Sequence, residues 1–309
     1  MTAFPRVSHE DVRNLGVEAW CRRLEQSASD PIQDGVRYPG FPDEAVQRQF
    51  AGSAGADALR EISQFYRLIQ THIWPRDRER GRYLDFGSGW ARVSRFFLRD
   101  FREGEMVGVD IDPDMVAFCR TSNQPGAYFA VDPQGALPFA PGTFGVITAY
   151  SVFTHLPPKI FATRLHDLIA LLAPGGLLVI TVEPPRFIDF IDSIPPETDQ
   201  AWWASLARQR HQVPRLRADL AAGGIAYLAS GGGEYRDQDI YGETVVTADY
   251  VRKAVRPLGQ LVEFVDDPQQ FWQAVAIIRR HDPVRDLWNH LLRTTTWPRR
   301  LARRLRRIW

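Results

Sequence analysis

Two aspartates and a glycine-rich turn are the residues of this chain best suited by type and spacing to hold a ligand. Asp85 stands two residues before Gly87 in the stretch LDFGSGWAR, and Asp110 closes the next apolar run, 25 residues after Asp85. Glycine lets a backbone approach a ligand closely, and a carboxylate at Asp110 can accept hydrogen bonds from both hydroxyls of a ribose. The pattern therefore predicts a nucleoside site.

The same turn disfavours ligands that are held mainly through phosphate. A dinucleotide fingerprint has a third glycine, and here Ala91 and Arg92 stand where it should fall. The Gly-Lys-Ser/Thr sequence of a phosphate-cradling loop is also absent. Both a dinucleotide and a cradled phosphate are therefore poor candidates.

Strands that alternate with helices must position these residues. The periodicity predicts an α/β fold, a doubly wound, Rossmann-like sheet with helices on both faces. Helices are expected at 91–101, 113–122, 159–173 and 247–255, and strands at 82–87, 106–112, 127–131, 144–151, 175–183, 261–267 and 271–280. The last two strands are too close in sequence for a crossover connection, so they must pair antiparallel.

Four successive motifs carry a resemblance to a known family. The chain resembles the class I S-adenosylmethionine-dependent methyltransferases in LDFGSGWAR, GVDIDPDMV, LPFAPGTFGVITAYSVFTHLPP and LAPGGLLVITVEPP. The resemblance covers roughly residues 83–182 and the antiparallel ending. It implies a seven-stranded sheet with an antiparallel last strand, and S-adenosylmethionine bound across the carboxyl ends of the first strands.

The resemblance also implies roles for the matching positions. Asp85 would support the turn and meet the cofactor's ammonium group, directly or through water. Asp110 would hold the ribose, Ile111 would pack on the adenine, and Asp132 would lie near the adenine amino group. The full implied cofactor set is Asp85, Gly87, Ser88, Gly89, Asp110, Ile111, Asp132, Tyr150 and Ser151.

Two residues are candidates for catalysis. A hydroxyl acceptor must lose a proton during methyl transfer, so it needs a base. His155 follows the fourth strand, and Glu183 ends the fifth, where active-site residues gather in open sheets. The alternatives are a structural histidine in a loop and a solvated acid before two prolines.

The segment 184–245 interrupts the alternation and is expected to be an insertion over the cofactor face, forming an acceptor lid together with residues 38–55. Its aromatic residues Trp202, Trp203 and Tyr241 form either a stacking platform for the acceptor or a small core of the insertion. Its acids either bind a divalent cation or form a solvated loop, and no metal site is assigned to them. These acids are Glu234, Asp237, Asp239 and Glu243.

The chain is expected to divide into an N-terminal helical extension (1–79), a methyltransferase domain (80–283) and a basic amphipathic tail (284–309). The last 17 residues hold seven arginines and no acid, and because the whole chain carries +1, the remainder carries −6. Such a tail fits an anionic membrane surface or nucleic acid, or is a solvated or packed end. No apolar run is long enough for a membrane span and no secretory signal pattern is present, so a cytoplasmic enzyme, peripheral at the inner membrane surface, is expected.

Within the superfamily, DFGSGWAR, SVFTHLPP and YGETVVTADYVRKAV resemble a bacterial branch found among glycan and secondary-metabolite biosynthesis genes. That resemblance implies O-methylation of a sugar, of a lipid-linked saccharide or of another small hydroxylated acceptor. The alternatives are an RNA or protein methyltransferase anchored by the tail, and a non-catalytic cofactor-binding partner protein. The acidic body is a poor match to a polyphosphate, which disfavours RNA.

Overall fold

A computed structural model describes residues 4–79, 81–195, 197–231, 235, 237 and 239–283 of the 309-residue chain. The predicted tail at 284–309 therefore lies outside the described residues. Within them no helix has both the length and the apolar character needed to cross a bilayer.

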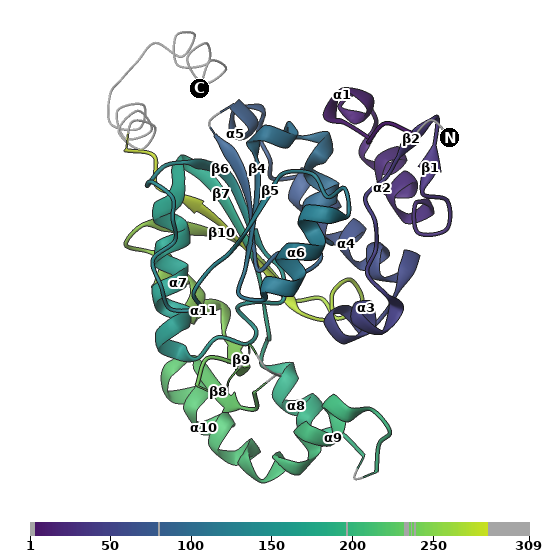
Figure 1. Ribbon diagram of the computed structural model, residues 1–309. Helices are drawn as coiled ribbons and strands as arrows, with labels where there is room; N and C mark the ends of the chain where they lie inside the picture. Colours follow the sequence, from purple (N-terminus) through teal and green to yellow (C-terminus); the bar gives the residue numbers. More distant parts are fainter. Residues whose placement is uncertain are drawn as a thin grey trace.

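A seven-stranded sheet in the order β10-β11-β7-β6-β3-β4-β5 is the centre of the fold (Figure 1). The strands β5, β4, β3, β6 and β7 are parallel, and β11 pairs antiparallel with both β7 and β10. The bounds are β3 Arg82–Phe86, β4 Met106–Asp110, β5 Ala127–Ala130, β6 Phe144–Ala149, β7 Leu172–Val182, β10 Gly259–Val265 and β11 Ala274–Arg280. The predicted fold class, with its antiparallel last strand, is confirmed.

Alternate residues of each central strand face two different hydrophobic clusters, because side chains alternate across a sheet. Tyr83, Val146 and Leu177 face one side, where the N-terminal helices lie. Leu84, Ile147 and Leu178 face the other side, which two later helices cover. The covering helices are α2 (Val17–Gln26) and α4 (Gly55–Gln70) on the first side, and α7 (Pro158–Leu171) and α11 (Ala248–Val255) on the second. Helix α6 (Pro113–Thr121) packs against β4 and β5.

The first expected helix is the element that the sequence pattern predicted wrongly. Instead of an α-helix at 91–101, the chain forms a 3₁₀ helix, η1 (Ser94–Arg99). Ala91 has a left-handed backbone with φ of 63°, which an α-helix cannot contain. The helical geometry therefore starts only beyond this residue.

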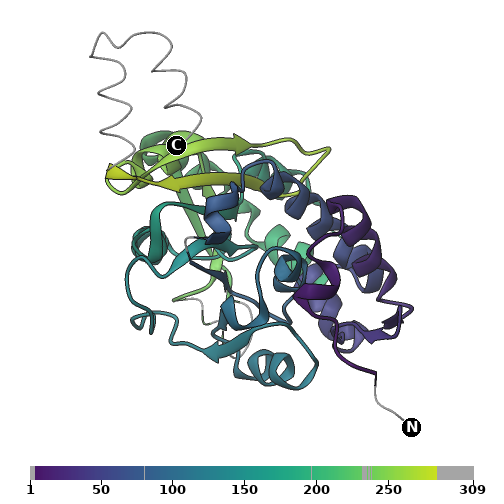
Figure 2. The ribbon, with the colours of Figure 1, turned by 90° about the horizontal axis from the view of Figure 1, so that it is seen from above.

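The N-terminal helices share one apolar cluster with the sheet and lie along one side of it (Figure 2). Trp20 is fully buried, and its indole N–H donates to the carbonyl of Phe96 at 2.7 Å. The remaining N-terminal elements are α1 (His9–Val12), β1 (Ile32–Gln33), β2 (Val36–Arg37), α3 (Glu44–Ala51) and α5 (Pro75–Glu79). Helix α3 extends to the end of the sheet at which the 184–245 insertion lies (Figure 1).

The insertion has its own hydrophobic core, with Phe187, Ile191 and Leu216 buried in it. It contains an antiparallel strand pair, β8 (Ile225–Ala229) with β9 (Gly242–Val246), and the helices α8 (Arg186–Ser193), α9 (Ala201–Arg208) and α10 (Val213–Gly223). An isolated parallel bridge from Glu183 to Val245 joins β7 to β9. The insertion is therefore attached where β7 ends.

Candidate active site

The glycine turn after β3 is held against the end of β4 by backbone hydrogen bonds. The amides of Gly87 and Ser88 both donate to the carbonyl of Val109, at 2.8 and 3.0 Å. Gly87 has a φ of 76°, and a Cβ built there would lie 2.2 Å from Cγ2 of Val152. The turn therefore requires glycine both for its backbone conformation and for the space beside Val152.

Asp110 is fixed at the end of β4 by the same turn. Its Oδ2 accepts a hydrogen bond from the amide of Gly89 at 2.7 Å, and its Oδ1 accepts one from the amide of Asp112 at 2.9 Å. Asp112 in turn caps the N-terminus of α6 by accepting from the amides of Asp114 and Met115. The carboxylate is thus oriented by backbone donors before any ligand binds.

Asp85 lies beneath the turn. Its Oδ2 accepts from the amide and hydroxyl of Ser94, at 3.0 and 2.6 Å, and only 1% of the residue is exposed. Burial raises the pKa of its carboxyl to about 6, against the lowering effect of the Ser94 hydrogen bonds. These contacts support the turn, while the expected contact of Asp85 with a cofactor ammonium group stays a prediction.

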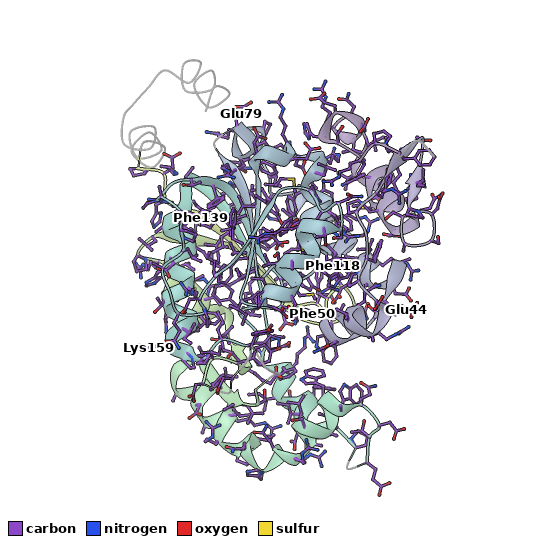
Figure 3. All side chains as sticks on the ribbon, viewed as in Figure 1. Glu44, Phe50, Glu79, Phe118, Phe139 and Lys159 are labelled. Carbon is purple, nitrogen blue, oxygen red and sulfur yellow. The ribbon has the colours of Figure 1, made fainter. Side chains whose placement is uncertain are left out.

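A cavity opens at the carboxyl ends of β3, β4 and β6 and brings together most of the residues that the sequence predicted. On its wall are Gly87, Ser88, Gly89, Asp110, Ile111, Asp132, Tyr150, Ser151 and His155. Asp85 and Glu183 do not line this cavity. Gln49 and Phe50 of α3 lie on the same wall, and Figure 3 labels Phe50 at the end of the sheet nearest the insertion.

Arg92 is a cavity residue to which the sequence analysis gave no role in binding. Its guanidinium donates to Oε2 of Glu61 at 2.9 Å and lies 5.1 Å from the ring centre of Tyr150. The Tyr150 hydroxyl donates to Oε1 of the same Glu61 at 2.7 Å. Helix α4 thereby fixes two side chains of the cavity. The position of Arg92, three residues after the second glycine of the turn, was the available sequence signal.

Ser151 and Asp132 differ most in how far the surrounding structure constrains them. Ser151 has a φ of 56°, its amide donates to the Thr181 hydroxyl at 2.7 Å, and its own hydroxyl accepts from Nε2 of Gln273 at 3.0 Å. Asp132 is exposed, and its Oδ1 accepts from the amides of Gln134 and Gly135. Asp132 is therefore the least constrained of the predicted carboxylates.

His155 lies on the cavity wall with its ring held on two sides. Its Nδ1 is 2.9 Å from the carbonyl oxygen of Gly242, which can only accept, so Nδ1 carries the proton. Its ring stacks on Tyr241, with the ring centres 4.2 Å apart and the planes 14° apart. In the neutral ring the lone pair is consequently on Nε2.

One of two buried carboxyls lies next to this histidine, because Oε2 of Glu243 is 3.6 Å from its Nδ1, and Glu183 lies near enough to Glu243 for their charges to interact. Glu183 and Glu243 are each 2% exposed, and burial raises both pKa values, that of Glu243 to about 7 and that of Glu183 well above its usual range. The proximity of Glu243 raises the pKa of Glu183 further, whereas Arg186 and Gln273 lower it. Glu183 is thus a buried acid and not a solvated one.

The acidic loop shows no cation site in its described part. Glu234 lies outside the described residues, and Glu243 points away from the loop into the protein, where it accepts from Trp202. Across the described part of the chain, no group of three or more His, Cys, Asp or Glu side chains is arranged to hold a metal ion.

The donor set of the cavity fits a nucleoside sulfonium. Asp110 offers a buried carboxylate to ribose hydroxyls, and the glycine backbone leaves room for close approach. The hydroxyl oxygen of Ser88 is buried and makes no hydrogen bond to any described residue, so it can serve a ligand.

Residues 84–176 match the model of a family described as "Methyltransferase domain". The crystal structure of the PH0226 protein from Pyrococcus horikoshii OT3 aligns with a TM-score of 0.51 at 15% identity, covering 78% of this chain and 100% of that one, and this likeness shows the fold alone. The matched segment runs from β3 into β7 and includes the glycine turn and Asp110, so this part of the chain is similar to a methyltransferase domain, and its site fits S-adenosylmethionine as cofactor.

Two curated relatives are similar to a part of the chain. The 2-methyl-6-phytyl-1,4-hydroquinone methyltransferase of Synechocystis is 34% identical over 99 residues, which is 31% of this chain and 30% of that protein. The fatty-acid O-methyltransferase of Mycolicibacterium smegmatis is 30% identical over 112 residues, which is 36% of this chain and 40% of that protein. The chain thus spans less than half the length of either relative.

Proposed function

We propose that this protein is an S-adenosylmethionine-dependent methyltransferase that methylates an oxygen of a sugar, of a glycan or of another small hydroxylated acceptor. The observation that carries this proposal is His155. It stands on the wall of the cofactor cavity, and its Nδ1 donates to the Gly242 carbonyl, so that its Nε2 is the basic nitrogen.

When bound, the cofactor supplies an electrophilic methyl group on sulfur. His155 then has one task, which is to accept the proton of the acceptor hydroxyl as the new oxygen–carbon bond forms. Asp110 and the glycine turn hold the nucleoside, and Tyr150, fixed by Glu61, closes the cavity beside them. The protein therefore contributes mainly alignment and proton removal.

Exclusion of water is the task of the insertion and α3. Ile240 and Tyr241 from the insertion and Gln49 and Phe50 from α3 line the cavity together with the glycine turn. A lid made from these two segments would enclose the acceptor and keep water from competing with it.

The acceptor class is inferred from the aromatic surfaces beside the base. Tyr241 stacks on His155, and Trp202 of α9 is 41% exposed next to Phe187 and Phe190. Flat aromatic faces suit the C–H faces of sugar rings and other partly apolar acceptors. O-methylation is also what the name of the Mycolicibacterium smegmatis relative states for that protein.

The test is transfer of labelled methyl from S-adenosylmethionine into a fractionated bacterial extract. Label in sugar or lipid-linked saccharide fractions supports the proposal, whereas label in RNA or protein overturns the acceptor class. The His155→Ala variant must bind S-adenosylmethionine normally and lose at least about 100-fold in transfer rate. Full transfer by this variant contradicts the role of His155.

We also propose that the basic tail gives peripheral contact with an anionic membrane, where a lipid-linked saccharide would be found. The seven arginines of the last 17 residues support this, because each basic residue near an anionic surface contributes about 1 kcal/mol. The 1–309 and 1–292 proteins are compared by sedimentation with vesicles containing anionic lipid or neutral lipid only. Equal binding of both proteins to anionic vesicles removes this role.

A further inference from the structure

Three segments that are distant in sequence meet at the side chain of Glu243. It belongs to β9, whereas His155 follows β6 and Trp202 comes from α9 of the insertion. The Trp202 indole N–H donates to Oε1 of Glu243 at 2.9 Å, and Oε2 of Glu243 lies 3.6 Å from Nδ1 of His155. The carboxyl group thus bridges the insertion and the cavity wall.

The two oxygens of Glu243 have different surroundings. Oε1 is fixed by Trp202, while Oε2 is buried and accepts no hydrogen bond from any described residue. A buried acceptor oxygen without a donor is costly, and a nearby imidazolium would compensate that cost. Nδ1 of His155 and Oε2 of Glu243 are 3.6 Å apart. We expect this distance to shorten when His155 takes up a proton, because the two side chains then carry opposite charges.

We propose that Glu243 is a positioning residue for His155, and that Trp202 sets the orientation of the Glu243 carboxylate so that the insertion controls the strength of the base. This inference rests on the role of His155 in the proposed function. The proton moves from the acceptor hydroxyl to Nε2 of His155, and Glu243 stabilises the resulting imidazolium without accepting the proton itself.

The other ionisable groups around Glu243 are consistent with this division of roles. Glu183, the residue after β7, lies near Glu243, and besides burial the charge of Glu243 raises the pKa of Tyr227 on β8. Burial raises the pKa of Glu183, as it does that of Glu243. The positive charge of Arg186 lowers the pKa of Glu183. The Glu243 pKa of about 7 reflects burial, partly opposed by the Trp202 hydrogen bond, so the carboxylate forms in the neutral range.

The test is NMR titration of the purified protein labelled at histidine, which requires no knowledge of the acceptor. The His155→Asn variant identifies the His155 signal. In Glu243→Gln we expect the pKa of His155 to fall by about one unit, a tenfold change in proton affinity, because an adjacent carboxylate favours the charged ring. An unchanged pKa of His155 overturns the inference.

The chain provides a matched control in a second His–Glu pair. Nε2 of His72 lies 2.9 Å from Oε2 of Glu263 on the far strand β10, away from the cavity. Glu263→Gln removes a carboxylate from beside a histidine outside the cavity and should leave the titration of His155 unchanged. If Glu263→Gln moves His155 as much as Glu243→Gln does, the shift is a general charge effect and the inference fails.

Trp202 is tested by a neighbouring pair of variants. Trp202→Phe keeps a ring but removes the donor to Glu243, so the pKa of His155 should change in the same direction as in Glu243→Gln, by a smaller amount. Trp203→Phe is the control, because Trp203 packs edge-on against Phe190 at 5.2 Å and belongs to the core of the insertion. Equal effects of the two variants contradict the orienting role of Trp202.

The failure of this inference can be told apart from that of the proposed function. The probe is labelled S-adenosylmethionine with the fractionated extract, at several pH values. If His155→Ala abolishes transfer while Glu243→Gln keeps the wild-type rate and pH profile, the proposed function stands and the role of Glu243 falls. If His155→Ala transfers normally, the base role of His155 in the proposed function fails, even where Glu243→Gln has shifted the pKa of His155.

Discussion

The two halves of the cavity are built in different ways. The cofactor half comes from residues near one another in sequence, 86–93 and 109–111, and its central contacts are backbone amides to Val109 and Asp110. The proposed acceptor half combines His155 and Tyr241, which come from two distant segments and contribute side chains. A site built from local backbone is nearly fixed by its short sequence, whereas a site built from distant side chains depends on the whole fold.

The carboxyl groups of the two halves also differ in how many of their oxygens accept hydrogen bonds. Asp110 has backbone donors to both of its oxygens, which is a satisfied arrangement. Glu243 has a donor to one oxygen only, and with Glu183 it forms a buried acidic pair. The proposed cofactor half is therefore preorganised for binding, whereas the proposed acceptor half is backed by a buried carboxyl group that has one oxygen without a donor among the described residues.

The largest expected effect comes from breaking the local backbone of the cofactor half. Gly87→Ala forces a Cβ to within 2.2 Å of Val152 at a φ of 76°. Strain and overpacking together cost about 3 kcal/mol, so affinity for S-adenosylmethionine should fall at least about 100-fold by calorimetry.

Gly52→Ala separates the two contributions. Gly52 has a φ of 69°, but nothing lies within 4 Å of its Cβ position. This variant should lose about 1 kcal/mol of stability and keep its cofactor affinity. If both glycine variants lower the affinity for S-adenosylmethionine equally, the close approach to Val152 does not explain the loss of affinity in Gly87→Ala.

The sequence predicted the cofactor half well for this reason. Strand positions followed from apolar runs, and the turn followed from two glycines and two aspartates within 26 residues. The pattern failed at 91–101, because the left-handed backbone of Ala91 depends on how the turn packs and not on local propensity. Domain boundaries at 79 and 283 and the individual site roles stay predictions.

The acceptor half could be predicted only in outline. Glu243 was visible as one acid in an acidic loop, but its burial depends on Trp202, 41 residues earlier, and on the pairing of β8 with β9 across residues 230–241. The bridge between Glu183 and Val245 likewise joins residues far apart in sequence. Short-range patterns carry no information on such contacts, so neither the acidic pair nor the β8–β9 pairing was predicted.

The next largest effect should come from Asp110→Asn. This change keeps the size of the side chain but removes the charge that would accept from two ribose hydroxyls, and its amide group clashes in polarity with the amide of Gly89. Loss of charged hydrogen bonds costs about 1.5–3 kcal/mol, which corresponds to a 10- to 100-fold weaker affinity for S-adenosylmethionine. An affinity within about twofold of wild type would falsify the ribose role of Asp110.

A change beside the proposed acceptor half should alter the pH dependence of stability rather than the affinity for S-adenosylmethionine. The folded pKa of Glu243 is about 7, above its ordinary value of 4.5, so its contribution to stability is present below about 4.5 and is lost as the pH rises through 7. Glu243→Gln removes this loss. The variant should gain about 2 kcal/mol over wild type in free energy of unfolding between pH 5 and pH 8, measured by denaturant titration.

An exposed acid provides the control for this pH effect. Glu44→Gln removes a carboxylate from an exposed ion pair with Arg48 and should leave the pH dependence of stability as it is in wild type. If Glu243→Gln shows the wild-type pH dependence as well, Glu243 is not the buried group that costs stability at high pH. A gain in stability combined with a weaker His155 base would be a trade of stability for function.

The smallest effect is expected at Asp132, the second carboxylate that the sequence placed in the cofactor half. Unlike Asp110, it is exposed, and its Oδ1 is occupied by the amides of Gln134 and Gly135. Asp132→Asn keeps an oxygen for these amides, so affinity for S-adenosylmethionine should fall by no more than about threefold, which is less than 1 kcal/mol. A loss as large as that of Asp110→Asn would mean that solvent-exposed and backbone-fixed carboxylates contribute equally, and that preorganisation does not distinguish the two positions.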